Sequence, residues 1–327
     1  MNVDNSRPQD NGHSLGLGAG DWVEVRSIGE VLATLDSLGC LEALPFMPEM
    51  VQYCGKRFRV FRSAHKACDT INKSGNRRMA NAVHLEGLRC DGQAHGGCQA
   101  RCLIFWKEAW LKRVSGPESK ERAAAPGRAP DVAVLNRATT LAEDPQRYRC
   151  QATELVRATT PMQWWEPWQY VKDLASRNFR LRDLLVYGLI AAYNALMGLH
   201  WRGRPYPHIS GLVEGKTPSV DLKLKAGELV EVRSKREIME TIARKNSRNR
   251  GLWFDVEMLA FCGRKYRVLS RVDRLIDERT GKMLQPTDAC IILDGVVCSG
   301  CLSGAKRLFC PRAIYPYWHE VWLKRVE

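Results

Sequence analysis

The sequence predicts an α+β protein: two tandem homologous small β-barrel domains of the SH3-like type, joined by a central helical segment. The first observation behind this fold class is a repeat, because residues 20–27 (GDWVEVRS) return as 227–234 (GELVEVRS). In a second repeat, residues 106–114 (WKEAWLKRV) return as 318–326 (WHEVWLKRV). The third observation is a strongly apolar stretch with helical spacing between the copies. Repeats of this kind indicate one folding unit used twice.

The repeat boundaries divide the chain. We expect a disordered tail over 1–19, a β-rich first copy over 20–114, a linker over 115–147, a helical connecting segment over 148–226 and a β-rich second copy over 227–327. The tail is polar and glycine-rich and lacks the apolar core of a secretory signal. The linker is rich in Ala, Pro, Arg and Glu, a composition typical of a spacer.

Each copy is expected to open with a strand followed by a helix. Apolar residues alternate over 22–25 and again over 229–232, which predicts a half-buried strand in each copy. Apolar residues at helical spacing then predict a short amphipathic helix over 30–38 in the first copy and over 235–244 in the second.

The next segments are predicted as β-hairpins. Residues 50–60 and 258–268 each read as strand, glycine turn and strand. In the second copy, residues 268–276 continue as a strand into the turn 277–281, and the β-branched run 290–297 returns. A curled sheet of about five strands per copy would therefore close into a small barrel.

The connecting segment carries the most apolar helix of the chain, predicted over 181–199. Its apolar run, 184–199, is shorter than the ~20 residues needed to span a bilayer. We expect this helix to be buried between the two barrels, with the tryptophans of 164–168 (WWEPW) anchoring that core. Peripheral membrane contact through 184–199 is the alternative, helped by the basic flank 201–204 (WRGR).

Twelve cysteines without a secretory signal indicate a reducing compartment, and we expect the protein in the cytoplasm. Aligning the copies leaves three retained pairs: Cys54 with Cys262, Cys90 with Cys298, and Cys98 with Cys310. The first pair precedes a turn glycine, where burial as a small apolar side chain explains a cysteine without chemistry. The other two pairs lie in loops and are candidates for metal binding.

The first copy offers Cys90, His95, Cys98 and Cys102 as metal ligands on one glycine-rich loop. Thiolate and imidazole in tetrahedral array suit zinc, and Gly96–Gly97 permits the tight backbone that such a loop requires. An open coordination position, the condition for catalysis, is expected in this copy if anywhere, because it also holds other histidines and an acid. Among these, His84 and Glu86 are expected on one face of a strand.

The second copy offers Cys298, Cys301 and Cys310, with a C-x-x-C spacing that favours zinc. Its fourth ligand is left open among the nearby Cys290, Cys262 and His319. An iron–sulfur cluster is the alternative cofactor, because three or four cysteines at unusual spacing also hold clusters. Thiols without metal are the remaining interpretation.

Four strings resemble a bacterial family of hypothetical proteins: 84–92 (HLEGLRCDG), 95–100 (HGGCQA), 105–111 (FWKEAWL) and 310–318 (CPRAIYPYW). The resemblance covers most of the chain. It implies no activity, cofactor or site residue.

The functional interpretation favoured by the sequence is a metal-stapled tandem module that binds zinc and engages a protein or an anionic ligand. The net charge of +14 favours an anionic partner. A metalloenzyme or biosynthetic accessory enzyme, with a redox or hydrolytic site in the first copy, is an alternative, so the sequence leaves open whether the protein is an enzyme. Nucleic-acid binding is a further alternative, less favoured because the basic residues are dispersed. The sequence contains no phosphate-binding loop, dinucleotide fingerprint or nucleophile elbow.

Overall fold

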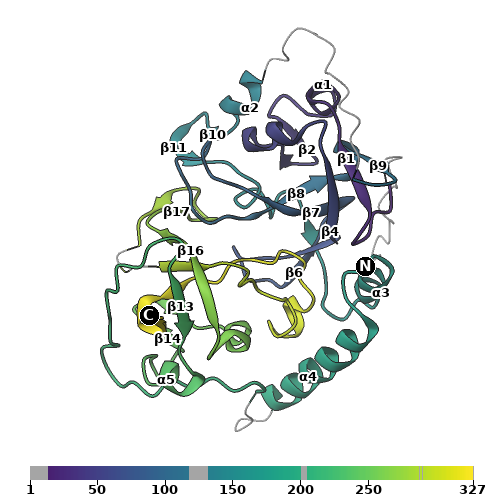
Figure 1. Ribbon diagram of the computed structural model, residues 1–327. Coiled ribbons are helices and arrows are strands. Elements are labelled where there is room, and N and C mark those ends of the chain that lie inside the picture. Colours follow the sequence, from purple (N-terminus) through teal and green to yellow (C-terminus); the bar gives the residue numbers. More distant parts are fainter. Residues whose placement is uncertain (1–13, 118–131, 200–204, 287, 289, 327) are drawn as a thin grey trace.

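The computed structural model describes residues 14–117, 132–199, 205–286, 288 and 290–326. It is a mixed α+β structure, mostly strands with few helices and curled sheets (Figure 1). In Figure 1 the first half of the chain, in purple and blue, lies above the second half, in green and yellow. The helices α3 (Trp168–Ala175) and α4 (Leu181–Leu199) run along one side of the molecule.

Each half contains one five-stranded antiparallel sheet. The first has the order β8-β7-β4-β1-β9, from strands Leu103–Lys107, Ala82–Arg89, Arg57–Ser63, Trp22–Val25 and Leu111–Val114. The second has the order β20-β19-β16-β13-β21, from strands Trp318–His319, Cys290–Leu293, Lys265–Val272, Leu229–Val232 and Leu323–Arg325. In both sheets the strand that comes first in the sequence, β1 or β13, lies between the next strand of that sheet, β4 or β16, and the last, β9 or β21. The strands predicted at 22–25 and 229–232 have these same bounds.

Short elements complete the two halves. They are β2 (Cys40–Leu41), β3 (Leu44–Pro45), β5 (Lys66–Cys68), β6 (Asn76–Arg78), β12 (Thr160–Pro161), β14 (Arg248–Asn249), β15 (Leu252–Trp253), β17 (Leu275–Ile276) and β18 (Met283–Leu284). Single turns of 3-10 helix precede the last strand of each sheet, as η2 (Glu108–Trp110) and η5 (Glu320–Trp322), and η4 (Ala305–Arg307) lies in the second half.

An aromatic pair at corresponding positions fills the core of each half. Phe46 and Trp110 meet edge to face at 5.2 Å, and Phe254 and Trp322 do so at 5.3 Å. All four rings are buried, and edge-to-face pairs contribute ~1 kcal/mol beyond the area they bury. Each half therefore has its own apolar cluster around an equivalent aromatic centre.

The helix after the first strand is shorter than the sequence predicts in both halves. It spans Ile28–Leu32 as α1 and Lys235–Met239 as α5, and each begins at a serine–glutamate capping box. The hydroxyl of Thr34 donates to the Val31 carbonyl at 2.7 Å. A side-chain bond of this kind competes with the next helical bond and helps to end α1 early.

The strand predicted before each glycine turn is wrong. These segments are 3-10 helices, η1 (Pro48–Tyr53) and η3 (Val256–Phe261). Pro48 presets the φ of a first helical residue, and the Asp255 side chain accepts from the Glu257 amide at 3.0 Å. The apolar residues that predicted a strand lie instead on the buried side of these 3-10 helices.

Parts of the predicted tail and of the predicted linker belong to the folded structure. The amides of Gly16 and Leu17 donate to the buried Glu108 carboxylate at 3.1 and 3.2 Å, because a buried carboxylate requires donors. Residues 14–19 are therefore part of the first half, and 1–13 lie outside the described residues. Within the predicted linker, 118–131 also lie outside the described residues. The part from 132 onward contains α2 (Ala133–Arg137), β10 (Thr140–Leu141) and β11 (Asp144–Tyr148).

The long helix α4 has the predicted bounds but is not buried between the halves. Only one side of it packs, onto the cluster of Leu308 and Phe309. Leu189 is 72% exposed, and the tryptophans of 164–168 are exposed as well, so they anchor no interdomain core. Among the described helices, none is long and apolar enough to cross a membrane.

Candidate functional site

In each half, one hairpin contacts the cysteine loop of the other half; the two cysteine loops are residues 90–102 and 298–310. The hairpin β5–β6 belongs to the first half, and the backbone amide of Cys68 in it donates to Cys310 Sγ at 3.2 Å. The hairpin β17–β18 belongs to the second half, and the amide of Ile276 in it donates to Cys98 Sγ at 3.4 Å. Cys68 and Ile276 align without a gap between the retained cysteines, and Cys98 aligns with Cys310. The two halves therefore exchange the same contact reciprocally.

Further hydrogen bonds hold each hairpin in place. The side-chain amide of Asn76 donates to the Leu308 carbonyl at 2.9 Å. On the other side, the Gln99 amide donates to the Arg274 carbonyl at 3.1 Å, and the Gln99 side chain accepts from the Asp273 amide at 2.6 Å. Both cysteine loops are thus built from segments of both halves.

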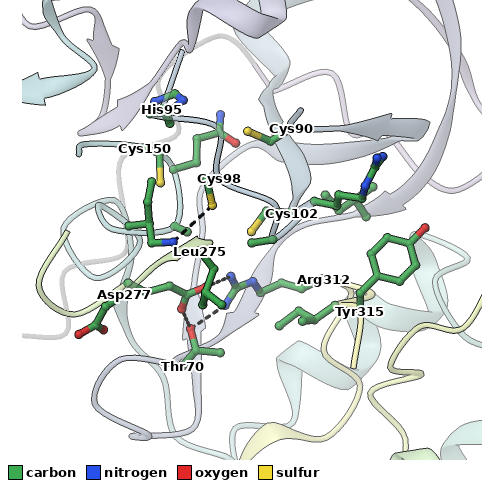
Figure 2. A pocket seen from close by; sticks show the side chains of 18 of the residues that line it. Thr70, Cys90, His95, Cys98, Cys102, Cys150, Leu275, Asp277, Arg312 and Tyr315 are labelled. Carbon is green, nitrogen blue, oxygen red and sulfur yellow. Dashed lines mark hydrogen bonds and ion pairs between the residues drawn. The ribbon is translucent and has the colours of Figure 1, made fainter. Parts of the chain in front are cut away.

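The first cysteine group consists of Cys90, Cys98, Cys102 and Cys150. Figure 2 shows these thiols around one space, a cavity of about 530 Å³ that they line together with His95. Three of the thiols were predicted as ligands, but Cys150 was not, because it comes from the segment between the copies and has no counterpart. Among the described residues, no three of these sulfurs lie within 4.8 Å of one another.

The second cysteine group consists of Cys68, Cys298, Cys301 and Cys310. Arg62 of the first half reaches the loop of this group, where its Nη1 donates to the Ser299 carbonyl at 3.5 Å, and burial lowers its pKa. Cys68 comes from the first half and lies against Cys310. Cys68, Cys298 and Cys310 of this group line a cavity of about 260 Å³.

The residues left open as a fourth ligand of the second copy lie elsewhere. Cys262, offered as a fourth ligand, packs against the second core with its counterpart Cys54 in the first. Cys290 belongs to a separate apolar cluster, and His319 Nε2 lies 3.0 Å from the Asn249 carbonyl. All twelve cysteines lie within the described ranges, and all are thiols without a disulfide.

A glycine two residues after the first cysteine closes both loops in the same way. Gly92 has φ 72° and Gly300 has φ 78°, a region that favours glycine. The carbonyl of Gly92 accepts from the Gly97 amide at 2.9 Å, and that of Gly300 accepts from the Phe309 amide at 2.7 Å. A Cβ on either glycine would overlap the carbonyl oxygen of the next retained cysteine. The sequence pointed to Gly96 and Gly97, whereas the shared requirement lies at Gly92 and Gly300.

A buried glutamate braces each loop from outside it. Glu49 Oε1 lies 2.6 Å from His95 Nδ1, and its counterpart Glu257 accepts from the Ser299 hydroxyl and the Leu302 amide, both at 2.6 Å. Burial acts to raise the pKa of Glu49, but His95 outweighs it and the pKa is lowered. Neither glutamate was predicted as a site residue, although the two align between the copies and that alignment was a usable signal.

His95 is held at both ring nitrogens. Its Nδ1 faces Glu49, and its Nε2 lies 3.2 Å from the Arg149 carbonyl. Glu49, Cys90 and His95 are the one group, among the residues described, whose three ligand atoms lie within 4.8 Å of one another. The comparison with Glu257 gives this group a bracing role that requires no metal.

The thiols differ in how readily they lose a proton. Burial acts to raise the pKa of Cys310, but the adjacent Cys68 and the Arg312 guanidinium outweigh it and hold that pKa below its ordinary value. Burial raises the pKa of Cys102 to about 12 and that of Cys298 to about 12. Without a cation these two thiols stay protonated at neutral pH, so binding a metal there would release protons.

Arg312 lies between the two cysteine groups and lines both cavities. Its Nη1 donates to the Cys68 carbonyl at 2.9 Å and to the Thr70 hydroxyl at 3.1 Å, and its Nη2 lies 3.4 Å from Glu278 (Figure 2). A buried, permanently charged group here favours thiolate over thiol on both sides.

His84 is a core histidine. It is fully buried, its Nδ1 lies 2.9 Å from the Ile104 carbonyl, and burial lowers its pKa to about 3, so it stays neutral. The expectation that His84 and Glu86 share a face is wrong, because the strand register shifts between His84 and Arg89 and leaves Glu86 exposed.

Comparison with known proteins adds no relative, since no protein-family model, no curated protein and no solved structure matches the chain.

Proposed function

We propose that the protein is a metal-binding module in which two cysteine groups hold zinc and fasten two copies of one small SH3-like barrel together. The reciprocal contact from Cys68 to Cys310 and from Ile276 to Cys98 carries this proposal. A backbone amide aimed at sulfur stabilises a thiolate, the form that binds metal, and gains little from a neutral thiol. Both copies keep this contact at the same positions.

Four thiols per group match the ligand number of structural zinc. The first site would use Cys90, Cys98, Cys102 and Cys150, and the second would use Cys68, Cys298, Cys301 and Cys310. Because the sulfurs stand farther apart than in a filled site, metal binding would draw the loops inward. The second site would take ligands from both halves, because Cys68 belongs to the first half, and its metal would clamp the halves together. The first site would tie the connecting segment to the first half through Cys150, while the Ile276 amide of the second half faces Cys98.

The strand connectivity supports the barrel part of the proposal. In each half the last strand returns beside the first after a turn of 3-10 helix, η2 or η5. Such a return curls a five-stranded sheet toward closure. Two barrels of one kind would present paired surfaces to a partner.

The larger cavity supports a second candidate function, an enzyme whose first metal site is open to a small molecule. Its lining is mostly apolar, with Leu103, Ile276 and Tyr317, and it also contains Arg101 and Glu278. A cavity of about 530 Å³ is within the range of small-molecule sites. Activity would require a coordination position left free by one thiol.

Metal analysis of three matched variants tests the proposal. Cys68→Ser and Cys98→Ser should each lower bound zinc by about one equivalent per chain. Cys54→Ser, in a half-buried position of the first core, should leave the zinc content unchanged. Full zinc in Cys68→Ser would contradict the cross-half ligand set.

A further inference from the structure

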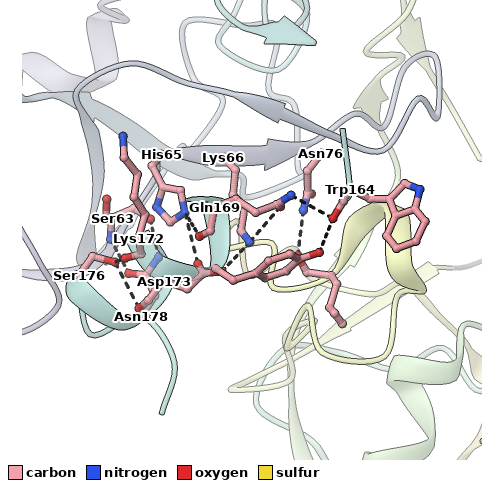
Figure 3. A network of polar contacts seen from close by, with 12 residues as sticks. Ser63, His65, Lys66, Asn76, Trp164, Gln169, Lys172, Asp173, Ser176 and Asn178 are labelled. Atoms are coloured by element: carbon pink, nitrogen blue, oxygen red, sulfur yellow. Dashed lines mark hydrogen bonds and ion pairs between the residues drawn. The ribbon is translucent and has the colours of Figure 1, made fainter. Parts of the chain in front are cut away.

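The helix α3 turns its polar side inward. Gln169 and Asp173, one turn apart, are buried against the hairpin of the first half. Lys66 Nζ donates to Asp173 Oδ2 at 2.6 Å and lies 3.5 Å from Gln169 Oε1 (Figure 3). His65 Nε2 lies 3.4 Å from Asp173 Oδ1. A buried polar network, not an apolar stripe, therefore anchors this helix.

The opposite side of α3 is apolar and exposed. Trp168 is 65% exposed, and Val171 and Leu174 continue its stripe at helical spacing. A surface helix of a globular protein normally buries its apolar stripe and exposes its polar one. The orientation of α3 is reversed, so the core of this chain does not explain the stripe.

The helix α4, next along the chain, carries an exposed apolar stripe of its own. Its Leu184, Tyr187 and Ala191 pack onto the second half. Leu185 and Leu189 lie on the other side, 59% and 72% exposed, and Tyr193 and Leu196 continue this second stripe. Exposed large apolar side chains concentrate in 164–196, which also holds the exposed Trp164 and Trp165. Exposed apolar side chains gathered on two successive helices mark a binding surface.

Basic side chains accompany this face. Lys172, Arg180 and Arg182 are exposed and make no ion pair within the described part of the chain. A second copy docked through the same face by a twofold axis would bring these like charges together. An anionic lipid surface instead complements them, and it also accepts tryptophan at the headgroup level.

We propose that the exposed face of α3 and α4 binds the surface of an anionic lipid bilayer. The stripe from Trp168 to Leu196 would enter the boundary between headgroups and acyl chains. The cations would remain among the lipid phosphates. This proposal is independent of the metal sites.

Sedimentation with lipid vesicles tests the proposal on the full chain. The protein should bind vesicles of phosphatidylcholine with phosphatidylglycerol, and bind phosphatidylcholine alone more weakly. Leu189→Glu should reduce partitioning into the mixed vesicles by about tenfold or more, because it places a charge in the apolar stripe. Leu38→Glu, also at an exposed leucine but in the first half, should bind like the wild type.

Circular dichroism should show both variants folded, since neither side chain is buried. Absence of binding to the mixed vesicles would overturn the proposal, as would equal binding by Leu189→Glu. A dimer in light scattering that Leu189→Glu dissociates, without vesicle binding, would assign the face to a second copy instead.

Discussion

Replacing Lys66 by Met should destabilise the protein strongly, because it leaves a buried carboxylate without its counter-charge. Lys66 and Asp173 are both fully buried, and their charged atoms lie 2.6 Å apart. Breaking such a pair from one side costs about 3–5 kcal/mol. Burial already raises the pKa of Asp173 to about 6 in the presence of the lysine. Without Lys66 that pKa should rise further, and protonation of Asp173 will limit the loss.

The sign of the pH dependence follows from this shift. A carboxyl whose folded pKa lies above its unfolded pKa contributes most at low pH, and that contribution is lost as pH rises through the folded pKa. The loss in Lys66→Met should therefore be larger near pH 8 than near pH 5.

Urea unfolding of wild type and variant at both pH values measures this difference. Lys172 is an exposed lysine next to Asp173 on α3, and Lys172→Met should change stability by less than about 0.5 kcal/mol. Replacing the pair together, as Lys66→Met with Asp173→Leu, should recover most of the loss. A loss below about 1 kcal/mol in Lys66→Met, or one equal at both pH values, would refute the reasoning.

Two further predictions concern a loop glycine and a surface carboxylate. Gly92→Ala should lower the melting temperature far more than Gly87→Ala, although both have φ above 70°, because only the first Cβ would overlap the Cys98 carbonyl. Similar melting temperatures for the two variants would show that the loop can shift. Lys112 and then Ser27 hold the pKa of Glu30 down to about 2. The contribution of Glu30 to folding stability should therefore disappear as the pH falls from the pKa of Glu30 in the unfolded chain through its folded pKa. Glu30→Gln should therefore lower stability slightly at neutral pH and not in acid, as acid titrations of both proteins would show.

Local patterns predicted the first strand of each half and the apolar helix of this chain. Alternating apolar residues predicted the first strand of each half, and apolar residues at helical spacing predicted α4 at Leu181–Leu199. The same hydropathy could not show what covers α4, because an apolar residue is compatible with a core, a partner or a lipid surface. The burial predicted for this helix was wrong for that reason.

The candidate sites were only partly accessible to sequence reasoning. Alignment of the copies singled out Cys90, Cys98, Cys298 and Cys310 as the loop cysteines that both halves retain. It gave no signal for Cys68 and Cys150. Cys68 reaches the second group from the first half, and Cys150 reaches the first group from the connecting segment. Contacts between distant segments leave no periodic pattern in one sequence.

The bracing glutamates are a different case. Glu49 and Glu257 align, but each directly precedes an apolar run that was predicted as a strand. That prediction gave no reason to place their side chains against the loops. Recognition of the 3-10 helices would have placed both carboxylates at a helix start, facing the loop donors.

Elemental analysis together with a visible absorption spectrum, on protein purified without oxygen, tests the central claim most directly. The two cysteine groups predict about two zinc ions per chain, no colour, and a lower melting temperature after chelation. A metal-free protein whose melting temperature is unchanged by added zinc would contradict the claim. Iron with sulfide and a brown chromophore would contradict it as well, and would assign the same thiols to a redox centre.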